Sequence, residues 1–299
     1  MKTQLTPPSR HCLAIALSGL ANLFLGASSL YWRALNDIQP TTLVAYRVAL
    51  SCAILTLLLL IFRRFNQTKI FTARLIATHC IASFFILINW GVFIWSSING
   101  YILESGLGYL LAPFISIALG ALVYHERMTP HKALSVLIAL SAIAFLMIFS
   151  KDLNHWIYLL IAATWGLYTY IKKSTSLNAV NGLFVETVFL TTCLAFAIWV
   201  FDLSIIWPNE LPSRAAPLIW LAGLVSVIPL LIFSFATGKI PLSLTGLLQF
   251  TLPLTLLTIG WLSDEKSLPT LSLTLIITTA GILASPLVYD MTVARRPKK

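Results

Sequence analysis

Charged residues are scarce in this chain: they make up 10% of its 299 residues, whereas a soluble domain carries about 25%. The only charged side chain between 75 and 125 is Glu104, and none occurs between 267 and 289. Apolar residues reach 58%, more than the one aqueous core of a soluble domain accommodates. The sequence therefore predicts a membrane protein, and it excludes a soluble domain within those two stretches.

The chain also lacks the motifs of several other protein classes. Its four cysteines lie far apart in apolar segments, without the spacing of a zinc or redox site, so we expect no metal and no cofactor. The pair Gly238-Lys239 lacks the upstream glycine of a phosphate-binding loop, and His125-Glu126 lacks the second histidine of a helical zinc motif. We therefore expect neither an ATP-driven pump nor an enzyme. The basic residues are scattered in short gaps rather than clustered on one face, so no nucleic-acid partner is expected.

Ten apolar segments are long enough to cross a bilayer, which takes about 20 residues of helix. Short segments join them, so no large domain lies outside the membrane. We predict an all-α membrane protein with ten transmembrane helices. The segments are 11–32, 41–62, 75–98, 102–124, 133–150, 155–171, 182–201, 215–237, 240–262 and 269–290.

The basic residues indicate how these segments are oriented. Placing both termini on the inner side puts fifteen Lys and Arg residues inside and four outside. Basic residues are retained on the cytoplasmic side of membrane proteins. We predict a multi-pass protein of the bacterial cytoplasmic (inner) membrane with both termini in the cytoplasm.

A shift of 140 residues aligns the two halves of the chain. The pattern Gly-x6-Pro-x6-Gly occurs around Pro113 and again around Pro253. Each half holds an odd number of spans, so the halves must enter the membrane from opposite sides. We predict two inverted five-helix repeats, over 1–150 and 151–299, with a substrate site between them near the bilayer midplane. The two prolines are hinge candidates, because each removes a backbone donor.

Three charged side chains lie within predicted spans, where such groups usually face the bundle interior or a wet cavity. Arg47 and Glu104 lie toward the outer side. The two residues form a static ion pair, or they belong to a substrate-binding or gating site. In a third interpretation, the side chain of Arg47 extends to the outer membrane surface. Its guanidinium can clamp a carboxylate through two hydrogen bonds. Glu186 lies toward the inner side. It is interpreted as a proton-coupling site, as a contact for a substrate ammonium group, as a structural hydrogen-bonding group, or as a side chain exposed to water near the inner mouth. His79 is interpreted as a core histidine rather than a proton relay.

Aromatic and amide side chains of the spans have the composition of a binding pocket. Four tryptophans near the span ends are assigned to the aromatic belts of the membrane interface: Trp32, Trp156, Trp199 and Trp207. The predicted substrate-binding or gating residues are Arg47, Asn89, Trp90, Phe93, Glu104, Tyr109, Trp165, Tyr168, Glu186 and Gln249.

The polar and aromatic positions of the run 89–113 resemble those of RarD-type permeases in the EamA family of the drug/metabolite transporter superfamily. The resemblance implies two inverted EamA repeats and a central cavity that moves small metabolites or drugs, typically outward. No catalytic residue is implied. The matching positions are Asn89, Trp90, Phe93, Trp95, Asn99, Glu104, Gly108, Tyr109 and Pro113, with further matches at Arg47, Glu186, Gln249 and Pro253.

These features favour a secondary carrier that exports amino-acid-like metabolites or drugs by alternating access. The expected partners are a small-molecule substrate and membrane lipid, with protons as a coupling ion; the sequence does not indicate the oligomeric state. The alternative is a non-transporting membrane component, such as a lipid-handling scaffold or a regulator. Saturable substrate flux distinguishes the two hypotheses.

Overall fold

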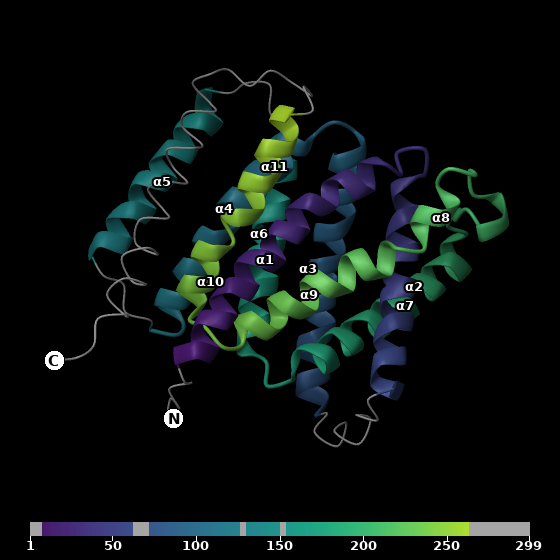
Figure 1. Cartoon of the computed structure of the whole chain (residues 1–299), viewed down its shortest axis with the longest axis horizontal. Coiled ribbons are helices and arrows are strands. Elements are labelled where there is room, and N and C mark those ends of the chain that lie inside the picture. The colour runs from purple at the N-terminus through teal and green to yellow at the C-terminus, as the bar shows by residue number, and fades with distance from the viewer. Residues whose placement is uncertain (1–7, 62–71, 126–129, 150–153, 263–299) are drawn as a thin grey trace.

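The computed structural model describes residues 8–61, 72–125, 130–149 and 154–262, and within them its regular structure is entirely helical. The helices pack into a bundle, with α5 at one edge beside α4 (Figure 1). The elements are α1 (Pro8–Arg33), α2 (Pro40–Ile61), α3 (Ala73–Ile98), α4 (Ile102–Leu122), α5 (Pro130–Phe149), α6 (His155–Ser174), α7 (Ala179–Phe201), the short 3₁₀ helix η2 (Pro208–Glu210), α8 (Ala216–Ile219), α9 (Ala222–Thr237), α10 (Leu242–Leu248) and α11 (Thr251–Leu262).

Seven helical segments of the described chain are long and apolar enough to cross a membrane. They coincide with predicted spans one to four and seven to nine, so the all-α membrane architecture is confirmed. At the fifth and sixth positions the structure has helices, α5 and α6, that do not belong to these seven. Most of α6 is buried, and its inward face carries polar and aromatic groups such as Trp165 and Lys172, which lower its hydropathy. The tenth predicted span, 269–290, lies outside the described residues.

Large apolar side chains cover much of the outside of the bundle. Trp199, Phe201 and Leu262 are 81%, 69% and 71% exposed. A monomeric soluble protein seldom exposes extensive apolar patches. Lipid chains cover such side chains in a bilayer, which agrees with the apolar length of the helices.

The eighth and ninth predicted spans are each broken in the structure. The eighth consists of α8 and α9; the ninth consists of α10 and α11, with the break at Gln249-Phe250. Pro253 has no N–H to donate to the carbonyl of Gln249, which accepts instead from the N–H of Leu252 at 3.1 Å. Pro253 thus lies in the first turn of α11, where its missing donor is tolerated. Its counterpart Pro113 lies inside the uninterrupted helix α4.

For several contacts between two helices, the two helices that the 140-residue shift relates to them also pack on each other. The shift relates α1 to α6, α2 to α7, α3 to α9, and α4 to α10 with α11. Helix α3 packs on α6 as α9 packs on α1, and α2 packs on α9 as α7 packs on α3. Helix α4 packs on α6 as α11 packs on α1. The fourth and ninth spans meet, because α4 packs against both α10 and α11.

Glycines allow α4 and α6 to approach closely. A Cβ atom at Gly108 would lie 2.7 Å from the Cβ of Ile161 and 3.0 Å from the carbonyl oxygen of Tyr158. A Cβ atom at Gly166, on the opposite helix, would lie 2.7 Å from the Cβ of Ile115. These positions therefore need glycine so that the two backbones can meet, as small residues do at other membrane helix interfaces.

We expect Gly108→Ala to lower the melting temperature of the protein in detergent micelles, because overpacking a filled contact costs about 1–3 kcal/mol. Gly91→Ala in α3 is the matched control, since a Cβ atom there meets nothing within 4 Å. Alanine also favours the helix at both positions. Thermal unfolding of both variants would measure the effect; equal melting temperatures would show that the α4–α6 contact accommodates a methyl group.

Candidate functional site

A small cavity lies inside the bundle, with walls from α1, α2, α3, α4, α6 and α11. Its volume is about 10 Å³, close to the space that one water molecule needs. Its walls bring together six of the predicted site residues: Arg47, Asn89, Trp90, Phe93, Tyr109 and Trp165. The remaining lining residues are Leu25, Ser28 and Leu252.

Among the described residues that line this central cavity, Arg47 is the only one with a charged side chain. The residue is 3% exposed, and its Cζ atom lies 4.0 Å from the ring centroid of Trp90 and 5.0 Å from that of Trp32. Contact with the faces of two aromatic rings attracts a cation. Nε and Nη1 of Arg47 have no hydrogen-bond partner. The guanidinium is therefore held by ring contacts while two of its nitrogen atoms stay unpaired.

Trp32 does not belong to an aromatic belt, so that prediction is wrong. Its side chain is fully buried and packs on the guanidinium of Arg47. The three other tryptophans assigned to the belts are 50%, 81% and 59% exposed, as a place at the membrane interface requires; they are Trp156, Trp199 and Trp207.

Asn89 connects three helices at the cavity wall. Its Nδ2 atom donates to Oγ1 of Thr164 at 3.2 Å and to the carbonyl oxygen of Ile161 at 3.4 Å. Its Oδ1 atom accepts from the hydroxyl of Tyr109 at 2.7 Å. The ring of Tyr109 in turn meets Trp165 edge to face, with centroids 5.8 Å apart. Asn89 thus fixes the aromatic side chains that form one side of the cavity.

Glu104 lies in the first turn of α4 and takes no part in this cavity. It is buried, and its Oε2 atom has no hydrogen-bond partner. Among the residues that the structure describes, Glu104 forms no ion pair with Arg47. The ion-pair interpretation of these two residues therefore does not hold in this conformation.

A second polar cluster surrounds Glu186, where α3 and α7 begin and α6 ends. The Glu186 Oε1 atom lies 2.8 Å from Nζ of Lys172 and 2.7 Å from Nδ1 of His79. The hydroxyl of Tyr168 donates to Oε2 at 3.1 Å, and Nε2 of His79 lies 2.7 Å from Oγ1 of Thr175. We call these five residues the Glu186 cluster. The carboxylate is fully paired by neighbours, which lowers the cost of burying it.

Lys172 is the charged residue of this cluster that the sequence analysis does not identify as a site residue. The sequence predicts that the sixth span ends at residue 171, which puts Lys172 among the basic residues of the inner loops. Helix α6 instead continues to Ser174, and Lys172 is 3% exposed. The available signal was its spacing of four from Tyr168, which puts both side chains on one helix face. His79 is buried and hydrogen-bonded, as predicted for a core histidine. Its partner, however, is the carboxylate of Glu186 rather than a neutral group.

Gln249 lies at the break between α10 and α11. Its Nε2 atom donates to Oγ1 of Thr169 in α6 at 2.8 Å, and its Oε1 atom accepts from Oγ of Ser116 in α4 at 3.4 Å. These bonds tie the broken span to two other helices of the bundle. Gln249 is not among the residues that line the central cavity.

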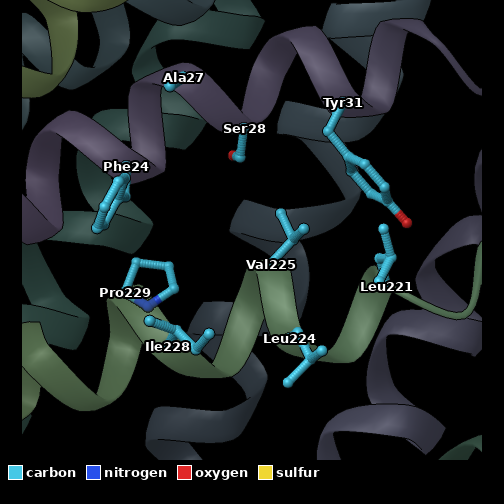
Figure 2. Close-up of a pocket in the computed structure, with 9 residues that line it drawn as sticks. All are labelled: Phe24, Ala27, Ser28, Tyr31, Leu221, Leu224, Val225, Ile228 and Pro229. Carbon is cyan, nitrogen blue, oxygen red and sulfur yellow. The ribbon is translucent and has the colours of Figure 1, made fainter. Parts of the chain in front are cut away.

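A wider groove of about 350 Å³ runs between α1 and α9 (Figure 2). Ser28 lines this groove and also the central cavity, so a single residue borders both spaces. The polar side chains of the groove are already bonded to backbone carbonyls: Ser28 Oγ donates to Leu25 and the Tyr31 hydroxyl to Leu218. The groove thus lacks free polar groups that would orient a ligand. The central cavity is the better candidate site.

We expect Lys172→Met to destabilise the protein by about 3–5 kcal/mol, because it leaves a buried carboxylate without its cation. Lys172→Met combined with Glu186→Leu should recover most of this loss, since the double variant removes both charges. Lys239→Met, at an exposed lysine, is the control. Chemical or thermal unfolding in detergent would measure all three; a double variant no more stable than Lys172→Met alone would argue against a coupled pair.

Comparisons with known proteins place this chain among membrane transporters. Residues 7–148 match the model of the EamA-like transporter family. Protein RarD of Streptomyces exfoliatus is 31% identical over 251 residues, which cover 82% of this chain and 78% of that protein. The uncharacterized transporter YojE of Bacillus subtilis is 30% identical over a region that covers 82% of this chain and 84% of YojE.

Two further likenesses agree with these. The chloramphenicol-sensitive protein RarD of Pseudomonas aeruginosa is 27% identical, with 76% of this chain and 77% of that protein covered. One solved crystal structure superposes with a TM-score of 0.63 over 91% of this chain and 98% of its own chain, at 15% identity. At that identity the crystal structure supports the fold alone.

Proposed function

Because this chain is a RarD-type permease of the EamA family, in the drug/metabolite transporter superfamily, we propose that it is a secondary carrier that exports small metabolites or drugs by alternating access. The observation that carries the proposal is the closed central cavity. Pocket-type side chains converge there, yet the space is about 10 Å³. A small-molecule site needs about 300–1,000 Å³, so the surrounding helices must move apart before a substrate can enter.

The moving parts in this proposal are two inverted repeats, 1–150 and 151–299, with both termini in the cytoplasm. The equivalent helix contacts in the two halves of the chain support this division into repeats. The fifteen-to-four distribution of basic residues supports the orientation. A pseudo-two-fold axis in the membrane plane then relates an arrangement open to one side to an arrangement open to the other.

The two polar regions differ in their place relative to the cavity: Arg47 lines it, whereas the Glu186 cluster lies outside its lining and acts as the inner gate. Adding 140 to the numbers of Arg47 and Trp32 gives Thr187, next to Glu186, and Lys172, the ion partner of Glu186. The Arg47 region and the Glu186 cluster therefore occupy equivalent places in the two repeats. The hydrogen bonds of the Glu186 cluster hold α3 to α6 and α7, and they must break for the inner side to open.

The helix break before Pro253 supplies a flexing point for this motion. The carbonyl groups of Leu247 and Gln249 accept tighter, three-residue hydrogen bonds there, at 3.3 and 3.1 Å. Such a junction between two short helices bends more readily than a continuous helix. Pro113 is its counterpart in α4, and the closed conformation keeps that helix intact.

We expect the purified protein in proteoliposomes to show saturable counterflow of at least one compound in a panel of amino acids, other carboxylates and drugs. Ser28→Phe, which fills the cavity, should abolish it. Leu30→Phe, on the exposed face of the same helix, should keep it. Folding of both variants is checked by size-exclusion chromatography. If the folded wild-type protein moves nothing in the panel, the alternative of a non-transporting membrane component is favoured.

The Glu186 cluster is the proposed site of proton coupling. Its ionisable members are Glu186, Lys172, His79 and Tyr168, all buried around one carboxylate. A proton that binds to the Glu186 carboxylate would remove its negative charge and so weaken its attraction to Lys172. The bonds between Glu186 and His79 that hold α7 to α3 would then loosen. Proton binding would thus favour opening on the inner side.

An imposed pH gradient should therefore stimulate substrate accumulation by the wild-type protein, and Glu186→Gln should lose this stimulation while keeping counterflow without a gradient. Glu210→Gln, at an exposed acid, is the matched control and should respond like the wild type. A Glu186→Gln protein that still responds fully to the gradient would remove Glu186 as the coupling site.

A further inference from the structure

Arg47 is a buried cation that pairs with no anionic side chain of the described residues. It is 3% exposed in the middle of the bundle, and its Nε and Nη1 atoms have no hydrogen-bond partner. Its Cζ atom lies over the rings of Trp90 and Trp32, 4.0 and 5.0 Å from their centroids. The rings accept no conventional hydrogen bond from these two nitrogen atoms. A buried charge without a partner is unfavourable, so this site is complete only when an anion meets the unpaired N–H groups.

None of the acidic residues that the structure describes neutralises Arg47. Glu186 is engaged by Lys172, His79 and Tyr168. Glu104 is buried but forms no ion pair with Arg47 within the described chain. The other described acids are exposed: Asp37, Asp202 and Glu210. The anion must therefore come from outside these parts of the chain, through the cavity that Arg47 lines.

The rest of the cavity wall indicates what the anion is attached to. It includes four aromatic side chains: Trp90, Phe93, Tyr109 and Trp165. The Nε1 atom of Trp165 is buried and unpaired, so it adds a second donor. Asn89 uses its oxygen to accept from Tyr109, and none of the described lining residues has a carboxylate to receive an ammonium group. A ligand that fits this wall has a hydrogen-bond acceptor group at one end and an apolar surface over the rest of the molecule.

We propose that the central cavity binds monoanionic carboxylates with an aromatic or branched apolar body, and that Arg47 clamps the carboxylate. This inference rests on the proposed carrier function and names its substrate class. A planar guanidinium matches a carboxylate through two parallel hydrogen bonds. One cation balances a carboxylate but leaves a phosphate monoester, with about −1.5 to −2 charges, unbalanced.

A matched pair of ligands tests the substrate class on the wild-type protein alone. N-acetylphenylalanine carries the carboxylate, and N-acetylphenylalaninamide differs by having a neutral carboxamide there. We expect the acid, and not the amide, to raise the melting temperature of the purified protein in a concentration-dependent way. Equal stabilisation by both, or stabilisation by neither, would overturn the proposal.

Variants of Arg47 then test the residue. Arg47→Gln should raise the Kd for the acid by about tenfold or more, since it removes a buried charge-assisted contact. Arg47→Lys keeps the charge but loses the planar fork, so it should bind with intermediate affinity. Arg214→Gln, at an exposed arginine, should bind like the wild type. Unchanged affinity in folded Arg47→Gln, or in Arg47→Lys should the first variant not fold, would overturn the assignment.

The carrier function and its substrate class fail separately. Counterflow of amines, zwitterions or neutral drugs with no preference for carboxylates would keep the carrier and remove the anion clamp. Absence of counterflow for every compound, together with stabilisation by the acid in a manner that depends on Arg47, would keep the binding site and remove the carrier.

Discussion

The interior of a membrane protein offers little water, so a buried charge must be neutralised by the chain or by a ligand. This constraint decides how the described helices meet. Around Glu186 the chain supplies the partners itself, and their hydrogen bonds join α3, α6 and α7. Around Arg47 it supplies aromatic faces only, from α1 and α3. The charge of Glu186 is thus neutralised within the described chain, whereas the charge of Arg47 is not.

The close contact of α4 with α6 places these two regions in one packed unit. Gly108 and Gly166 let the helices approach, which brings Tyr109 against Trp165 with ring centroids 5.8 Å apart. Trp165 then stacks on Tyr168, also at 5.8 Å, and the hydroxyl of Tyr168 donates to Glu186. A continuous series of contacts thus runs from the cavity wall to the carboxylate. A shift of α6 that enlarges the cavity must also disturb the bonds of Glu186.

The sequence predicted the helices better than the contacts between them. Hydropathy is summed over a whole span, so the helix positions and the membrane environment follow from composition alone. Which side chains meet depends on how each helix is rotated about its axis, and this comes from packing. Lys172 and Glu186 are separated by a helix end and a turn, so no local pattern pairs them. Trp32 was likewise assigned by its place near a span end, whereas rotation of α1 points it at Arg47.

The difference between the two charged regions is itself an argument about mechanism. In the proposed repeats they occupy equivalent positions, since the 140-residue shift takes Trp32 to Lys172 and Arg47 to Thr187, beside Glu186. Symmetry of the backbone supplies the two-sided motion, but identical chemistry on both sides would bind the substrate equally in both arrangements. One region closed by its own ion pair and one that needs an external anion make the two arrangements respond differently to the substrate. A ligand shifts a conformational equilibrium only through such a difference in binding.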